Sequence, residues 1–274
     1  GGTSIGTTTD DTPAYTFNSN DAGTINFGGS CASSTTDAVN GANTVNLNHL
    51  SPGNYSDCTV SVNDAAGNTS NTLALSTFAI LPSSEIRVSD AGPGSCGDFN
   101  GPCLASIQQA IDELAVGGTI NVLAGGYSLD QTLAVNKSLT LSGPGTADSN
   151  NLATINGVCN NIFDITANNV TISGFELMDE CNSATIIQIQ QGADNTTIEN
   201  NIIRDGDTGV YINGYNGPTE NTVIENNQIN NNGSYGIYLQ GNVSGTSISN
   251  NSISQSSSGW GAIYSDDFDL TFTS

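Results

Sequence analysis

The chain has 274 residues, of which 26 are Asp or Glu and only 3 are Lys or Arg, so its formal net charge is −23 at pH 7. Phosphate groups are bound mainly by Lys and Arg, so this composition excludes nucleic acid as a partner and disfavours anionic membranes. No run of 18 apolar residues occurs, so we expect no membrane insertion.

The six cysteines fall two to a region, which suggests three local disulfides, Cys31–Cys58, Cys96–Cys103 and Cys159–Cys181. Disulfides persist in oxidising compartments, so we predict a secreted, extracellular or cell-surface protein; the alternative is three pairs of free thiols in a cytosolic one. The first residues, GGTSIGTTTD, are not a signal peptide. We expect that a signal has been removed or that the chain is a piece of a longer precursor.

Residues 1–12 are rich in Gly, Ser and Thr, which is typical of a leader or linker. From Pro13 to Ile80, short segments alternate apolar and polar residues between turns, and this predicts a small β-sandwich within a first domain of residues 1–82. The segments DDTPAYTF, AGTINFGGSC and LSPGNYSDCTVSVNDAAGNTSNTL resemble bacterial Ig-like domains over about residues 8–80. That resemblance implies a spacer or adhesion module.

One turn of the sandwich carries Asp64 and Asn68, which are candidate calcium ligands. The alternative is a turn that these side chains stabilise by hydrogen bonds, since Asp, Asn and Gly favour turns in any case.

The segment Leu81–Ser84 predicts a domain boundary, with a second domain over residues 83–274. Within it, Ile107, Ala110, Ile111 and Leu114 have helical spacing after the capping residue Ser106. The pattern predicts a helix that ends at Gly117–Gly118 and caps the open core of the repeats that follow.

An internal repeat occupies residues 169–265. Its period is 26, 26 and 24 residues, measured between Ile172, Ile198, Ile224 and Ile248. Ile, Val, Thr and Tyr alternate with polar residues, and Asn and Gly mark the corners, so each period predicts short strands joined by tight turns. Such periods bury their apolar columns only by stacking. Asn201, Asn227 and Asn251 recur at one position and predict a ladder of side-chain amides.

The segment GTINVLAGGYSLDQTLAVNKSLTLSGPG, which follows the predicted helix, resembles the opening of pectate-lyase-like parallel β-helix proteins. The resemblance covers about residues 86–265 and implies a right-handed parallel β-helix, a fold that hosts many activities. We therefore expect an all-β protein: an N-terminal Ig-like sandwich, then a right-handed parallel β-helix with one N-terminal capping helix.

Pectate lyases rely on basic residues to abstract a proton, and this chain has only Arg87, Lys137 and Arg204, which argues against that activity. Hydrolases use paired carboxylates. Asp205 and Asp207 lie in one predicted turn, and Asp179 and Glu180 lie one period earlier. They are candidates for an acid/base pair, for a calcium site, or for solvent-facing turn residues.

Tyr215, Tyr235 and Trp260 lie in predicted turns among Asn, Asp and Gln, so they are candidates for stacking on sugar rings. We assign the neighbouring Tyr211, Tyr238 and Tyr264 to packing. The last segment, Asp266–Ser274, alternates like a strand. It either continues into a longer precursor or docks onto another copy of the chain.

These patterns favour an extracellular structural or adhesive protein, with assembly into a fibre or lattice left open, and they lean against an enzyme. The alternatives are a carbohydrate-active enzyme and a calcium-dependent glycan-binding module. We expect that no cofactor is required, and calcium is the one cofactor that these patterns leave open. The partners left open are polysaccharide and other copies of the chain.

Overall fold

The computed structural model describes residues 2–97, 99, 101–255 and 260–266. Contacts between Cα atoms divide the chain into two compact units, residues 1–83 and residues 84–274. Each unit has its own apolar core. No helix among the described residues is long and apolar enough to span a membrane.

The first unit contains three small sheets, which are consistent with a sandwich. Their strand orders are β1 (Thr7–Thr8), β9 (Phe78–Ile80), β6 (Gly53–Tyr55); β2 (Ala14–Ser19), β5 (Gly41–Asn46); and β4 (Asp37–Ala38), β3 (Gly23–Gly28), β7 (Thr59–Asp64), β8 (Leu73–Ala74). Alternate residues of these strands, such as Tyr15, Phe17, Val60 and Val62, point into one core.

Residues 1–12 are not merely a leader, which corrects the expectation from composition. Thr7 and Thr8 pair in parallel with Ala79 and Ile80 as strand β1. Ile5 packs against the core of this unit. Nδ1 of His49 also lies 2.8 Å from the carboxylate of Asp11. One partly buried Ile and a short backbone ladder therefore outweigh the flexibility that Gly, Ser and Thr suggest.

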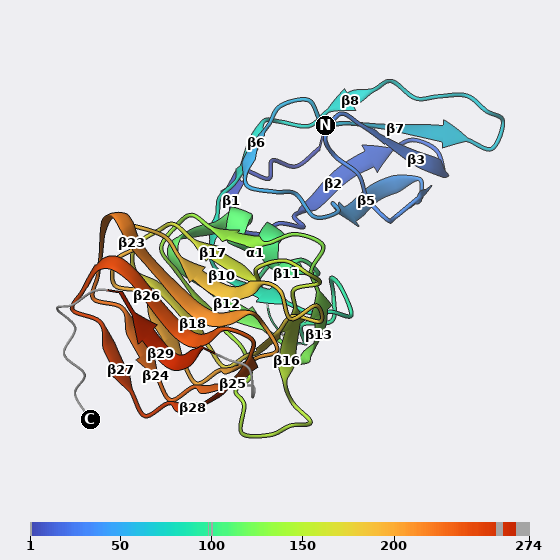
Figure 1. Ribbon diagram of the computed structural model, residues 1–274. Coiled ribbons are helices and arrows are strands. Elements are labelled where there is room, and N and C mark those ends of the chain that lie inside the picture. The colour runs from blue at the N-terminus through green and yellow to red at the C-terminus, as the bar shows by residue number, and fades with distance from the viewer. Residues whose placement is uncertain (1, 98, 100, 256–259, 267–274) are drawn as a thin grey trace. The chain divides into compact units, whose positions relative to one another are not determined.

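The second unit is a parallel β-helix whose coils each contribute one strand to three sheets (Figure 1). Sheet I has the order β11 (Cys103–Leu104), β10 (Ser83–Val88), β12 (Leu114–Val122), β15 (Leu139–Ser142), β18 (Val170–Ser173), β21 (Thr197–Glu199), β24 (Val223–Glu225), β27 (Ser247–Ser249). Sheet II has the order β13 (Gly125–Ser128), β16 (Ala153–Asn156), β19 (Glu176–Met178), β22 (Ile202–Arg204), β25 (Gln228–Asn232), β28 (Ser252–Gln255). Sheet III has the order β14 (Leu133–Val135), β17 (Phe163–Ile165), β20 (Thr185–Ile189), β23 (Thr208–Glu220), β26 (Tyr235–Ser244), β29 (Gly261–Ser265).

The predicted repeat columns are confirmed as the core of this β-helix. Ile172, Ile198 and Ile224 are paired in register on successive strands of sheet I and are fully buried, with Ile248 packed against them. The columns that begin at Leu177 in sheet II and at Val210 in sheet III stack in the same way. Full burial of one such side chain contributes about 1.5–3 kcal/mol, so each coil is stabilised by its neighbours.

The asparagine ladder is also confirmed, at the corner between sheets I and II. In each coil the residue before the ladder has a left-handed backbone, with φ of 57° at Asn200, 56° at Asn226 and 55° at Asn250. Asn adopts this conformation more readily than other non-Gly residues. The next residue then turns its amide inward, where Asn201 and Asn227 are buried.

The capping helix α1 (Ile107–Glu113) begins where expected, with Ser106 as its cap, but it ends earlier than predicted. Leu114 is already extended, with φ −64° and ψ 141°, and starts β12. Gly118 pairs with Leu139 in the ladder between β12 and β15. Leu114 therefore begins the paired strand β12 and does not continue the helix, although its spacing is helical. Nζ of Lys137 donates to the carbonyl oxygens of Asp112 and Leu114 and closes the end of the helix.

Three disulfides link Cys31 to Cys58, Cys96 to Cys103 and Cys159 to Cys181. Bonds of this kind fit an oxidising compartment. Most of the predicted C-terminal strand, residues 267–274, lies outside the described residues, so docking onto another copy stays a prediction.

Candidate functional site: a polar network and a tyrosine face

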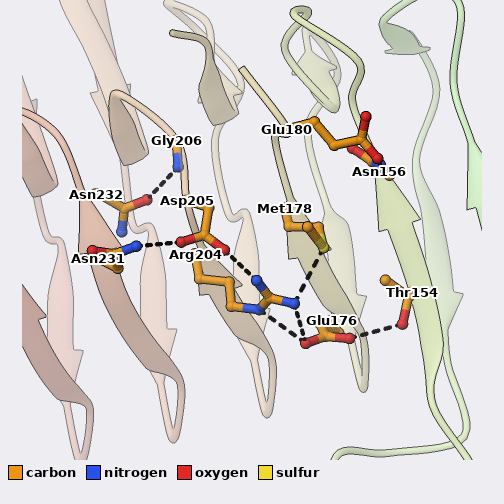
Figure 2. A network of polar contacts seen from close by, with 10 residues as sticks. All are labelled: Thr154, Asn156, Glu176, Met178, Glu180, Arg204, Asp205, Gly206, Asn231 and Asn232. Carbon is orange, nitrogen blue, oxygen red and sulfur yellow. Dashed lines mark hydrogen bonds and ion pairs between the residues drawn. The ribbon is translucent and has the colours of Figure 1, made fainter. Parts of the chain in front are cut away.

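Two outward faces of the β-helix gather chemistry-bearing side chains. The first is the network on sheet II in Figure 2, with Arg204 at its centre. Its guanidinium donates from Nε to Glu176 at 2.9 Å, and Nη1 pairs with the carboxylate of Asp205. Glu176 also accepts from the hydroxyl of Thr154 at 2.8 Å, and Asn231 donates to Asp205. One cation is thus shared by two carboxylates.

The two neighbouring carboxylates determine the pKa of Arg204. Partial burial lowers the pKa of the guanidinium, but its hydrogen bonds to Glu176 and Asp205 outweigh that effect, so the pKa is raised. Arg204 stays charged and neutralises its two partners.

Asp207 faces different partners from those of Asp205. It accepts from the hydroxyl of Ser234 at 2.6 Å and from that of Thr208 at 3.3 Å. Its backbone carbonyl accepts from the N–H of Ser234. The two carboxylates that the sequence proposes as a pair are therefore each engaged by separate groups.

Asp179 is not solvent-facing, which corrects that expectation. It is fully buried, and its carboxylate accepts from four backbone N–H groups, those of Cys159, Cys181, Ser183 and Ala184, at 2.8–3.3 Å. A buried carboxylate satisfied in this way organises the turn that the disulfide Cys159–Cys181 closes. Glu180 is exposed and accepts from Nδ2 of Asn156 (Figure 2).

In the sandwich, Asp64 accepts from the backbone N–H groups of Ala66 and Asn68 and from the side-chain amide of Asn68. The hydrogen bond from the Asn68 side chain is the main reason that the pKa of Asp64 is lowered. This is the geometry of a side-chain-stabilised turn. Among the described residues, no group of three or more His, Cys, Asp or Glu is arranged to hold a metal ion.

The second face lies on sheet III and is called here the tyrosine face: Tyr211, Tyr235, Tyr238 and Tyr264. Tyr211, Tyr238 and Tyr264 are paired in register on β23, β26 and β29. Their ring centroids are 5.2 and 5.4 Å apart. Tyr235 lies 5.0 Å from Tyr238 and 5.1 Å from Tyr264. The result is a continuous aromatic surface along the helix axis.

Polar groups fix these rings. The hydroxyl of Tyr211 is hydrogen-bonded to Gln240, and that of Tyr238 lies 3.4 Å from Asp266. Asp266 is held in turn by the N–H of Gly241 at 2.7 Å. Burial, and secondarily the charge of Asp266, raises the pKa of Tyr238 to about 12. The phenol of Tyr238 is thus a neutral hydrogen-bonding group at physiological pH.

Amides continue the face along sheet III. Gln188 is the in-register neighbour of Tyr211 and accepts from Asn161 at 2.7 Å. Gln190 donates to Asp164 at 2.7 Å and accepts from Asn213 at 3.2 Å. An aromatic surface bordered by amides and a carboxylate offers both stacking and hydrogen bonding to a polyhydroxylated ligand.

The sequence named Tyr235 as a candidate but assigned Tyr211, Tyr238 and Tyr264 to packing, although the last of these is 44% exposed. The missed signal was the column of tyrosines directly after Val210, Ile237 and Ile263, since the residue after a buried one points outward on a strand. The other two candidates, Tyr215 and Trp260, are 72% and 82% exposed. Tyr215 lies in the irregular part of β23 between Gly214 and Thr219, and Trp260 directly precedes β29.

A family model described as "Right handed beta helix region" matches residues 140–274. No curated protein matches the sequence. Matching solved structures include ORF18 of Geobacillus virus E2, at 15% identity, covering 73% of this chain and 46% of that one, with a TM-score of 0.47. Pectate lyase Pel9A matches at 17% identity over 61% of this chain and 47% of that one, with a TM-score of 0.37. The catalytic domain of a GH87 alpha-1,3-glucanase in complex with nigerose matches at 13% identity over 94% of this chain and 54% of that one, with a TM-score of 0.41. The chain spans about half the length of these proteins.

Proposed function

We propose that the chain is an extracellular adhesive module that binds polysaccharide through the tyrosine face. The supporting observation is the in-register stack of Tyr211, Tyr238 and Tyr264 with Tyr235 beside it. Aromatic side chains that are not needed for the core supply apolar ring surface for contact with sugar rings, and the neighbouring amides supply hydrogen bonds to hydroxyl groups.

The charge of the protein favours a neutral polysaccharide over an acidic one. The chain has three Lys and Arg in all, and Arg204 is already paired with Glu176 and Asp205 on sheet II. Asp164 and Asp266 flank the amides and tyrosines on sheet III. A uronate polymer would place carboxylates against these, at a Coulombic cost.

Binding without cleavage is favoured because the candidate catalytic carboxylates are engaged elsewhere. Asp205 is paired with Arg204 and Asn231, and Asp207 accepts from Ser234. Both lie in the turn between sheets II and III: Asp205 directly follows the sheet II strand β22, and Asp207 directly precedes the sheet III strand β23.

Isothermal titration calorimetry tests the proposal with cellohexaose and xylohexaose as neutral probes and hexagalacturonate as the acidic one. We expect binding of at least one neutral probe and none of the acid. Replacing Tyr264 by Ala removes about 1 kcal/mol of stacking, or roughly five-fold in affinity, and Tyr238→Ala/Tyr264→Ala about thirty-fold.

The matched control is Val116→Ala, which shortens another exposed apolar side chain, 77% accessible on β12. It is expected to leave affinity unchanged. Equal affinity in the wild type and the double tyrosine variant would rule the tyrosine face out as the binding surface.

A further inference from the structure

The β-helix also has a concave site, far in sequence from the tyrosine face. A cavity of about 500 Å³ lies between the start of α1 and the segment 126–134. This volume is in the range of small-molecule sites, which run from about 300 to 1,000 Å³. All of its lining residues belong to the second unit.

Three contacts hold the cavity open. The Gln108 side chain accepts from the N–H of Ala134 at 2.8 Å and donates to its carbonyl oxygen at 3.4 Å, which ties α1 to the edge of β14. Asp90 accepts from the N–H of Gly126 at 3.2 Å. A Cβ atom added to Gly126 would meet nothing within 4 Å, so this glycine leaves open space in the cavity wall.

The lining combines apolar and polar groups. Ile107, Leu129 and Leu133 supply apolar surface. Ser128, Gln131 and Thr132 line the same space, and their side chains make no hydrogen bond to any described part of the chain. Their hydroxyl and amide groups are therefore available to a ligand, as is the usual pattern in a site that binds polyhydroxylated molecules.

The negative charge of the cavity lining favours neutral or cationic ligands. Two carboxylates, Asp90 and Asp130, line the cavity, and none of its lining residues is Lys, Arg or His. An anionic ligand would be repelled, whereas a protonated amine would be attracted. We propose that this cavity binds a single sugar unit without an acid group, and that an amino group on the sugar strengthens binding.

The site is separate from the tyrosine face. Its lining includes Gly126 of β13 and Leu133 of β14, the first strands of sheets II and III, so the cavity lies at the first coil of the β-helix. The tyrosines lie on the last described coils of sheet III. The two proposals therefore stand or fall independently.

Calorimetry or saturation-transfer NMR with D-glucosamine, D-glucose and D-glucuronate tests the inference. We expect millimolar binding, tightest for glucosamine, weaker for glucose and undetectable for glucuronate. Gly126→Leu fills the open space and is expected to abolish binding. Asp130→Asn, an exposed position with no described hydrogen bond, is expected to reduce the preference for glucosamine over glucose at least three-fold without affecting the fold.

Glu220→Gln is the matched control, because it removes one negative charge from an exposed site outside the cavity. It is expected to leave monosaccharide binding unchanged. The proposal is overturned if none of the three sugars binds, if glucuronate binds as tightly as glucosamine, or if Gly126→Leu in a folded protein and Asp130→Asn both bind like the wild type.

Discussion

The backbone N–H of Phe175 donates a hydrogen bond of 3.0 Å to the side-chain oxygen of Asn201, one coil later in the β-helix. The side-chain oxygen of Asn227 likewise accepts from the backbone N–H of Asn201 at 2.9 Å. The side-chain N–H of Asn227 donates to the carbonyl oxygen of Ile198. Each asparagine side chain thus supplies hydrogen-bond partners to backbone groups at the buried corner of the coil before it.

Asn227→Ala is expected to destabilise the β-helix by about 2–4 kcal/mol, because it leaves a buried donor and a buried acceptor without partners. Urea unfolding of the wild type and variant measures the difference. Asn216→Ala, at an exposed position of the same unit, is expected to change stability by less than about 0.5 kcal/mol. Equal losses in both variants would show that the ladder does not stabilise the corner.

Asp179→Asn tests whether the buried carboxylate organises its turn. The amide replaces one acceptor oxygen by a donor that faces backbone N–H groups, so we expect a loss of at least 2 kcal/mol. The adjacent Glu180→Gln removes the same charge from an exposed side chain and is expected to cost little. Thermal unfolding with and without calcium checks both. A calcium-dependent rise in Tm that requires Asp179 would instead support the calcium site.

Arg204→Met leaves Glu176 and Asp205 beside each other without their shared cation. Because the ion pairs of Arg204 are part-buried, we expect the variant to lose about 1–2 kcal/mol of unfolding free energy, between the values for exposed and buried ion pairs. Unfolding at low and high salt measures it, and the loss should shrink as salt screens the carboxylates. Adding Glu176→Gln is expected to recover part of the stability. A double variant no more stable than Arg204→Met contradicts the electrostatic account.

The raised pKa of Tyr238 predicts a loss of stability at alkaline pH. The native state holds the phenol neutral up to a pKa of about 12, whereas an unfolded tyrosine ionises near pH 10. Its contribution is therefore present below about pH 10 and is lost as the pH rises through 12. Phenolate absorbance should show one fewer late-titrating group in Tyr238→Phe. Asp266→Asn should lower the pKa only in part, because burial is the larger cause.

The columns of Ile172 and Val210 predict the three sheets because strand periodicity and repeat length are both written in the order of apolar residues. The end of α1 was missed because Leu114 fits both the helical spacing and the first position of β12, and the pairing with β15 decides between them. Local sequence does not encode that competition.

The candidate sites were harder to predict. Asp179 looks like any acidic turn residue, and only the fold brings four backbone N–H groups around it. The spacing of Tyr211, Tyr238 and Tyr264 was visible in the sequence, but stacking depends on strand register, which a single period does not fix.

A crystal structure of the protein with a bound neutral hexasaccharide tests the central claim most directly. The account predicts pyranose rings lying over Tyr238 and Tyr264 on sheet III, with hydroxyl groups hydrogen-bonded to the neighbouring amides. A saccharide seated instead beside Asp205 and Glu176 on sheet II would contradict it and would favour carbohydrate chemistry at the carboxylates.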